Sequence, residues 1–285
     1  MTTVDRTKLY GILHQLDGKP IERQVRVLKV GIGVPVGPDV HVWIDGQGQW
    51  SVETGAHPNG KRQLQIQRFG AREQAELYYR QQRKSAPERK APRKIPYFTF
   101  LRMEGHGQFV HDFDAIEQHG ATPAEIDVMF LTESNFDASF QAWSSSKLLC
   151  EGDGRHARRH VEWPQTNGEK RLAQAARETG DRFFSLTDAC FACGCPFARG
   201  EKPPCKPHGR LYFQLVHAPR IGGACQFDTT GYRSIAQLSS SLQQIRSLTG
   251  RGNPEAGSVA GIPLKLVLRP YRAQHQGQTS VQYGV

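Results

Sequence analysis

The thiol-rich stretch is the part of this sequence whose residue types and spacing most clearly predict chemistry. Four of the six cysteines, Cys190, Cys193, Cys195 and Cys205, lie close together, and His208 follows. Zinc in proteins is held by four thiolate or imidazole ligands in a tetrahedron, and two ligands separated by two residues can hold one ion from a tight turn. The spacing therefore predicts a structural zinc site, whose metal supplies folding energy to a segment with almost no apolar core.

Five ligands are available for four places in this site. Cys190 with Cys193 and Cys205 with His208 both have the two-residue spacing, and Cys195 can replace either Cys193 or His208. A closed set of four ligands leaves no position for water, which is typical of a scaffolding metal rather than a catalytic one. Cys150 and Cys225 lie outside the cluster, beside expected strands, and we predict that they are small buried hydrophobes.

A second group of polar residues has the pattern of a hydrolytic metal site. It consists of His106, His111, Asp112 and Asp114. Such a group can bind a divalent ion and activate water. The simpler interpretation, which we favour, is that Asp114 caps a helix, Asp112 is exposed and the histidines lie on the surface.

Two shorter patterns follow it along the chain. His156 and His160 would share one face of a helix, but the arginines beside them favour phosphate contact or a solvated basic turn instead. Glu151 and Asp153 look like paired carboxylates, although Asp153-Gly154 is more simply a turn.

Charge is distributed unevenly along a chain whose net charge is +10. Residues 61–94 contain eleven Lys or Arg and three acids, whereas residues 103–146 contain eight acids and no Lys or Arg. Cations that neutralise phosphates, beside Tyr78, Tyr79 and Tyr97 for stacking on bases, are typical of single-stranded DNA binding. The alternative is a solvated basic helix and linker. The residues predicted to contact nucleic acid are Arg80, Arg83, Lys84, Arg89, Lys90, Arg93 and Lys94.

The expected elements around these residues define an α+β fold with a mixed or antiparallel sheet. Residues 25–69 are β-rich, residues 72–84 form a helix, and the prolines of 85–96 predict an extended, exposed linker. The clearest helix is 232–248, where Ile235, Leu238, Leu242, Ile245 and Leu248 form one apolar stripe between a Thr230 cap and Gly250. Further strands are expected at 97–103, 125–131, 209–217 and 262–271, with short helices from residue 114 to Gly120 and within 169–178. Residues 146–150 lead into a tight turn.

These elements suggest three consecutive parts. Residues 1–95 form a β-rich region with the basic helix and linker, and residues 96–272 form the core domain, which contains a zinc-binding insertion at 186–209. Residues 273–285 form a flexible tail. No apolar run is long enough to span a bilayer and the N-terminus lacks an apolar targeting segment, so we expect a cytoplasmic protein without membrane contact.

The C-terminal half resembles a known family. The order LLCEGDG, CGCPF, CKPHGRLYFQLV, TTGYRSIAQLSSSLQQIRSLTG and GIPLKLVLRPY, over about residues 145–272, is similar to recombination directionality factor-like proteins of phages and integrative elements. The resemblance implies a non-catalytic accessory protein that binds a site-specific integrase and switches it from insertion to excision. The features that the resemblance carries over to this chain are Cys190, Cys193, Cys195 and Cys205, together with the helix at 232–248.

The leading hypothesis is therefore a non-enzymatic, zinc-containing accessory of DNA recombination from a mobile element, whose partners are an integrase, DNA or both. The first alternative is a single-stranded DNA-binding module used in element replication or defence. The second is a metal-dependent hydrolase that acts through the His106–Asp114 group.

Overall fold

The computed structural model describes residues 26–34, 37–56, 63–89, 93–104, 108–133, 135–144, 147–187, 204–217, 219, 221, 223–275 and 278–285. Within them the chain forms four helices and eighteen strands, in both parallel and antiparallel pairs, which confirms the α+β prediction. The chain divides into two compact units. The first includes 134–211 and 228–258, and the second includes 24–133, 212–227 and 259–285.

The first unit contains an antiparallel sheet. Its strands are β10 (Phe136–Ser144), β11 (Lys147–Gly152), β12 (Ala157–His160), β13 (Phe183–Leu186) and the first part of β14 (Lys206–Leu215). Consecutive strands from β10 to β13 pair with one another, and β14 pairs with the other side of β10. Helix α3 (Asn167–Glu178) lies between β12 and β13 in the sequence, and its Ala173 packs with Val161 and Phe184.

Helix α4 (Tyr232–Thr249) covers the sheet of this first unit with the predicted apolar stripe. Ile235, Leu238 and Leu242 are buried, whereas Leu248 at the far end is 74% exposed. Gly209 on β14 permits this packing, because a Cβ atom there would lie 2.8 Å from Ile235 Cγ1. Gly250 ends the helix as predicted, but Gly231 rather than Thr230 occupies the N-cap.

The second unit contains a mixed sheet. Strand β1 (Arg26–Val34) runs parallel to β15 (Ala224–Thr229) and antiparallel to β7 (Arg93–Met103), which in turn pairs with β8 (Phe109–His111). Strand β9 (Glu125–Met129) pairs with β16 (Pro263–Val267) and with the end of β14. Helix α2 (Phe113–His119) follows β8 directly and ends at Gly120, as predicted.

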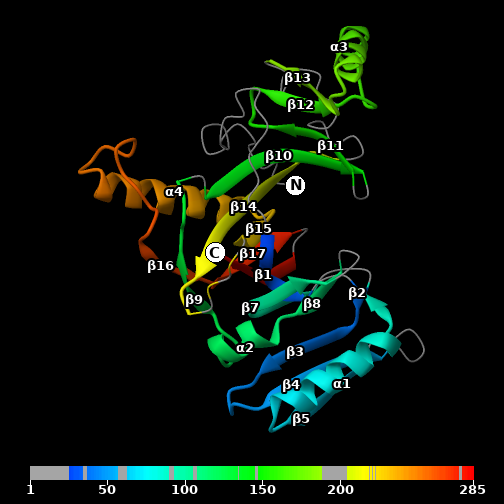
Figure 1. The fold of residues 1–285 in the computed structure, drawn as a ribbon, viewed down its shortest axis with the longest axis vertical. Coiled ribbons are helices and arrows are strands. Elements are labelled where there is room, and N and C mark those ends of the chain that lie inside the picture. Colours follow the sequence, from blue (N-terminus) through cyan, green and yellow to red (C-terminus); the bar gives the residue numbers. More distant parts are fainter. Residues whose placement is uncertain are drawn as a thin grey trace. The chain divides into compact units, whose positions relative to one another are not determined.

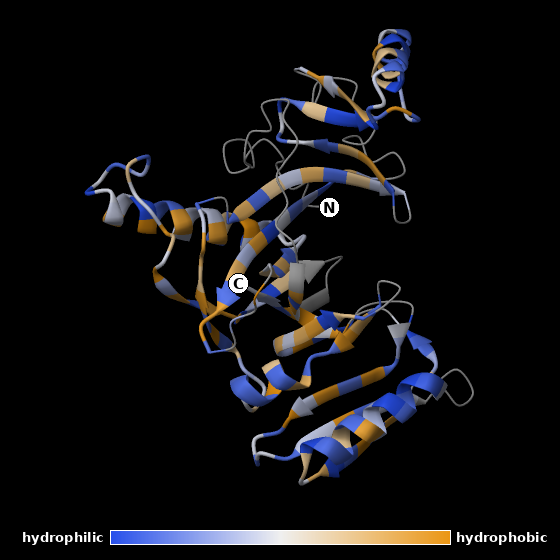
Figure 2. Cartoon of the chain, viewed as in Figure 1, coloured by the Kyte–Doolittle hydropathy of each residue, from blue (hydrophilic) through white to orange (hydrophobic). Residues whose placement is uncertain are grey.

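A smaller sheet of the same unit carries the basic helix α1 (Arg72–Ser85). Its strands are β3 (Val40–Ile44), β4 (Trp50–Ala56) and β5 (Gln63–Phe69), paired antiparallel in that order. Figure 1 shows α1 lying across this sheet, and Figure 2 shows the helix as mostly hydrophilic. Ala75 and Tyr79 are its buried residues, so the cations of α1 lie on the faces turned away from the sheet.

Two segments differ from their expected conformations. The predicted exposed linker contains β6 (Glu88–Arg89), which pairs with β2 (Gly37–Pro38), and the start of β7. The expected flexible tail contributes to a hairpin of β17 (Arg269–His275) and β18 (Gln278–Gly284). In both places backbone hydrogen bonds to a neighbouring strand order residues whose side chains are mostly polar.

Candidate nucleic-acid interface

The second unit contains a pocket between α1 and the strands β7 and β8, which we call the α1–β8 pocket. Its volume is about 530 Å³, within the size range of small-molecule sites. Four cations line it, three from α1 and one from β7, together with three glutamates and the buried side chains of Tyr79 and His111. The lining cations are Arg80, Arg83, Lys84 and Arg102, and the glutamates are Glu76, Glu88 and Glu104. Three residues predicted to contact nucleic acid therefore lie at one concave surface.

The cations of this pocket differ in how far they are neutralised. Arg80 forms an ion pair with Glu76 at 2.6 Å, and Arg83 lies 3.5 Å from Glu104. Lys84 and Arg102 form no ion pair with any acid in the described part of the chain. Their positive charges are therefore available to attract an anionic ligand.

The remaining predicted cations have other surroundings. Arg89 is 9% exposed and forms an ion pair with Asp39, which is 1% exposed. Arg93 pairs with Glu53 at 2.5 Å, and Lys94 donates to the side-chain oxygen of Gln282. Lys90 lies outside the described residues. The basic segment thus separates into pocket cations on α1 and cations engaged with their own unit.

The tyrosines of the segment are not placed for stacking on bases. Tyr79 is 4% exposed, and its hydroxyl accepts a hydrogen bond from the backbone N–H of His111 at 3.1 Å. Tyr78 packs against Phe69, and Tyr97 hydrogen bonds to His41. Because these rings already contact protein, the arrangement favours phosphate contact over the stacking that single-stranded DNA binding uses.

A buried chain of polar groups lies behind the pocket. The Tyr97 hydroxyl is 2.8 Å from His41 Nε2, and His41 Nδ1 is 3.2 Å from His111 Nε2. His111 Nδ1 is buried and has no hydrogen-bond partner among the described residues. Burial lowers the pKa of His111 to about 3 and lowers that of His41 well below its usual value, so both rings are neutral at pH 7.

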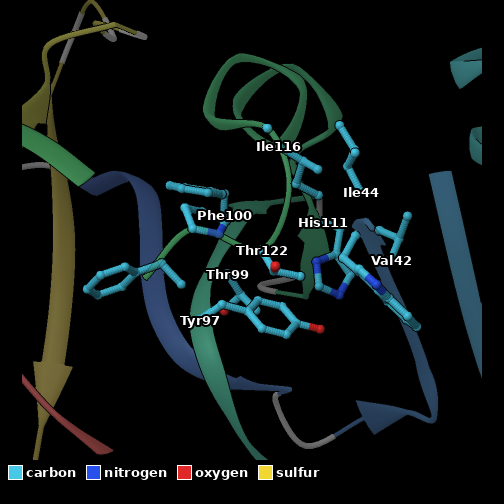
Figure 3. A pocket seen from close by; sticks show the side chains of 12 residues that line it. Val42, Ile44, Tyr97, Thr99, Phe100, His111, Ile116 and Thr122 are labelled. Carbon is cyan, nitrogen blue, oxygen red and sulfur yellow. The ribbon is translucent and has the colours of Figure 1, made fainter. Parts of the chain in front are cut away.

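His111 also lines a second, much smaller cavity of about 10 Å³, which is roughly the space of one water molecule. Figure 3 shows this cavity, with His111 between Val42 and the strand that carries Tyr97 and Thr99. Sequence reasoning missed the pair because His41 and His111 are 70 residues apart. The only local signal was a histidine within the otherwise apolar strand β3.

The predicted roles in the His106–Asp114 group were wrong for three of its members. His111 and Asp112 are each 3% exposed, and Asp112, not Asp114, caps α2 by accepting from Ala115 N–H at 2.9 Å. Asp114 instead pairs with Arg72 at 2.5 Å. His106 lies outside the described residues. The group's described carboxylates thus have structural partners.

The two shorter patterns of the sequence, His156 with His160 and Glu151 with Asp153, both lie in the first unit and are engaged in structural contacts. Asp153 accepts hydrogen bonds from the backbone N–H groups of Arg155 and His156, which confirms a turn. His160 ends strand β12, so His156 and His160 do not share a helix face. Arg158 pairs with the buried Glu151 at 2.8 Å, and Arg159 pairs with Glu169 at 2.5 Å.

The predicted zinc ligands fall in two groups. Cys190, Cys193 and Cys195 lie outside the described residues, whereas Cys205 is buried and immediately precedes β14, and His208 lies within that strand. Among the residues that the structure describes there is no group of three or more metal-binding side chains. Cys150 and Cys225 are buried, as predicted. The zinc site itself stays a prediction.

The extended backbone at β14 bears on which ligands fit one ion. Residues Lys206 to His208 pair in register with Gln141 to Ser139 of β10. Side chains of an extended strand alternate between faces, so positions three apart point in opposite directions. Cys205 precedes this strand and His208 lies within it, and the set of zinc ligands stays a prediction.

Comparisons with known proteins identify the family. No curated protein and no solved structure matches this chain. No helix in the described part of the chain is both long and apolar enough to cross a membrane. The family model of Gp3-like, recombination directionality factor-like proteins matches residues 61–285, which extends the resemblance seen in the sequence to strand β5 and the basic helix α1. The chain therefore belongs to the recombination directionality factor-like family.

Proposed function

We propose that this protein is a non-catalytic accessory factor of site-specific recombination in a phage or other mobile element. The observation that carries the proposal is the family match, which covers 61–285 and so includes most of both units. In this role the protein binds the element's integrase and biases it toward excision, with DNA as a second contact.

The environments of the polar groups support an accessory role over hydrolysis. A general base or metal ligand needs a side chain that can reach a substrate. His111 is buried against His41, Asp112 caps α2, and Asp114 is paired with Arg72. The two carboxylates are thus held by structural partners, and the imidazole is packed against a second imidazole.

The end of α4 is the part of the first unit that best fits an integrase contact. Leu248 is 74% exposed, and the following loop folds tightly on the helix, with Thr249 Oγ1 accepting from Ser258 N–H at 2.9 Å. Gly257 allows this close approach, since a Cβ there would lie 1.7 Å from Arg246 O. A partner that covers this side chain would remove its apolar surface from water, which favours binding.

The test is recombination in vitro with the integrase encoded by the same element. We expect the purified protein to raise excision between the two hybrid attachment sites and to lower integration. Leu248→Glu is expected to weaken integrase binding at least about tenfold, because it places a charge in an apolar contact. Leu172→Glu, on the exposed face of α3, is the matched control and keeps parental binding. Unchanged recombination in both directions on addition of the protein would refute the proposal.

We further propose that Cys190, Cys193, Cys195 and Cys205 hold one structural zinc ion as thiolates. The burial of Cys205 and the extended backbone from Lys206 to His208 support this choice over a site that includes His208. Such an ion would tie the cysteine-rich segment to the start of β14 and stabilise it.

Elemental analysis of the purified protein is expected to give about one zinc per chain. Cys195→Ser and Cys205→Ser should each lose the metal, because a thiolate ligand is removed from a closed site. His208→Asn should retain it. The opposite pattern, with metal lost in His208→Asn and kept in Cys195→Ser, would assign the fourth place to the imidazole instead.

A further inference from the structure

We propose that the α1–β8 pocket binds a nucleotide phosphate, with Lys84 and Arg102 as its charged contacts and His111 Nδ1–H as a buried donor. The proposal deepens the DNA contact of the proposed function and rests on it. The shared ligand chemistry is a phosphate ester, which either a DNA strand or a free nucleotide can supply.

The two cations provide the attraction. Lys84 and Arg102 come from different elements, α1 and β7, and both line the pocket. Neither is neutralised by an acid of the described residues, in contrast to Arg80 and Arg83. A guanidinium and an ammonium that converge on one space are suited to the separate oxygens of a phosphate.

Glu88 limits how strongly an anion binds here. It lines the same pocket, is exposed, and forms no ion pair with the described cations. Its carboxylate repels a phosphate that Lys84 and Arg102 attract. Attraction by two cations and repulsion by one carboxylate together predict a modest affinity for phosphate. Removing the charge of Glu88 should raise this affinity, whereas removing the charges of Lys84 and Arg102 should lower it.

The buried imidazoles provide a directional donor. Each neutral ring carries one N–H, so the hydrogen bonds from Tyr97 through His41 to His111 have two consistent directions. If the Tyr97 hydroxyl donates to His41 Nε2, then His41 Nδ1–H donates to His111 Nε2, and His111 Nδ1 carries the proton. In the opposite direction His111 Nδ1 is a bare acceptor.

A phosphate oxygen selects the first direction, because it can accept from an N–H but cannot donate to a bare nitrogen when ionised. His111 Nδ1 is buried and lacks a hydrogen-bond partner among the described residues, and His111 belongs to the lining of the pocket. Ligand binding therefore satisfies a buried polar atom and fixes the tautomers of both imidazoles together.

The pocket is larger than a phosphate group alone needs. Its volume of about 530 Å³ accommodates a phosphate with its sugar. The tyrosine beside it, Tyr79, is buried and unavailable for stacking on a base. We therefore expect recognition of the backbone with little base preference.

The experiment measures binding of a short labelled DNA duplex by the full-length protein at several salt concentrations, with inorganic phosphate and a mononucleotide as separate ligands. Lys84→Gln/Arg102→Gln is compared with Arg171→Gln/Arg272→Gln, which removes the same charge from exposed positions of α3 and β17. Glu88→Gln is the third variant.

The pocket variant should weaken phosphate-ester binding at least about tenfold, while the charge-matched control changes it less than about twofold. Glu88→Gln should strengthen binding. If DNA is the source, the slope of log K against log salt falls in magnitude by about two in the pocket variant. If a free nucleotide is the source, that ligand alone shows the difference. Equal losses in the two double variants, or no binding of any of the three ligands, would overturn the pocket.

An NMR measurement on the parent chain tests the buried donor without a core substitution. Nitrogen-15 spectra of the imidazoles should show His111 Nδ1 as protonated when the mononucleotide is bound. A bare Nδ1 in the complex would overturn the role of His111. If the pocket variant stimulates excision as strongly as the parent does, phosphate binding in this pocket is not needed for the accessory role. That role is tested separately, by the recombination assay with the integrase.

Discussion

Arg89→Ala is expected to lower the free energy of unfolding by about 3–5 kcal/mol, because it removes a guanidinium that neutralises the buried carboxylate of Asp39. Asp39 is 1% exposed and the Arg89 side chain 9% exposed. Burial lowers the pKa of Arg89 to about 10, so its guanidinium is still charged at neutral pH. Urea unfolding followed by circular dichroism measures the change.

The control is Arg80→Ala on α1, in the same basic segment. Arg80 is 63% exposed and paired with Glu76 at 2.6 Å within one helix. Exposed pairs of this kind contribute about 0.3–0.5 kcal/mol, so this variant should keep nearly parental stability. If Arg89→Ala instead left stability unchanged and abolished DNA binding, Arg89 would be a nucleic-acid contact as the sequence alone suggested.

Acid should destabilise the protein in a range of pH where most proteins are still stable. In the folded state His111 has a pKa of about 3 and that of His41 is also lowered, whereas an unfolded imidazole titrates near 6.5. Below about pH 6.5 the unfolded chain therefore binds protons that the folded chain does not. The stability present above this pH is lost as the pH falls toward the folded pKa of His111, by about 1.4 kcal/mol per pH unit for this imidazole. His41 contributes in the same direction.

The charges around the pair act in the same direction as burial. Arg93 lowers the pKa of His41, and Arg83 and Arg89 lower that of His111. Urea unfolding at pH 7, 6 and 5 measures the slope. In His41→Gln/His111→Gln the slope should be reduced.

Direct titration keeps this prediction testable if the double variant does not fold. The ring signals of His111 in the parent chain should not titrate between pH 8 and 5. A midpoint near 6.5 would contradict the prediction.

Elements with a regular apolar period were predictable from the sequence. The apolar stripe of α4 identified its length and buried face, because Ile235, Leu238 and Leu242 recur on one side. The helix α1 was predicted from its composition and ended, as expected, before the prolines. Strand β18 was missed because few of its residues are apolar, so no period marked it, and its order comes from backbone pairing with β17.

The site was harder to predict, because its parts meet only in the fold. Cations of α1 were identified, but nothing local distinguishes Lys84, whose charge remains available, from Arg89, which neutralises a buried acid 50 residues away. The same holds for the chain from Tyr97 to His111, whose links join residues 56 and 70 positions apart. Charge runs identify a segment, whereas burial decides which of its members can meet a ligand.

The parallel pairing of β1 with β15 has a consequence for synthesis of the protein. Arg26 lies opposite Ala224 in this ladder, so the partner of strand β1 is made much later than β1 itself. About 200 residues separate them, which corresponds to roughly 10–40 s of translation at typical bacterial and eukaryotic rates. During that interval one edge of β1 is without its final neighbour. This sheet therefore closes only after about 200 further residues have been synthesised, and the demand for chaperones that protect the open edge should last through that interval.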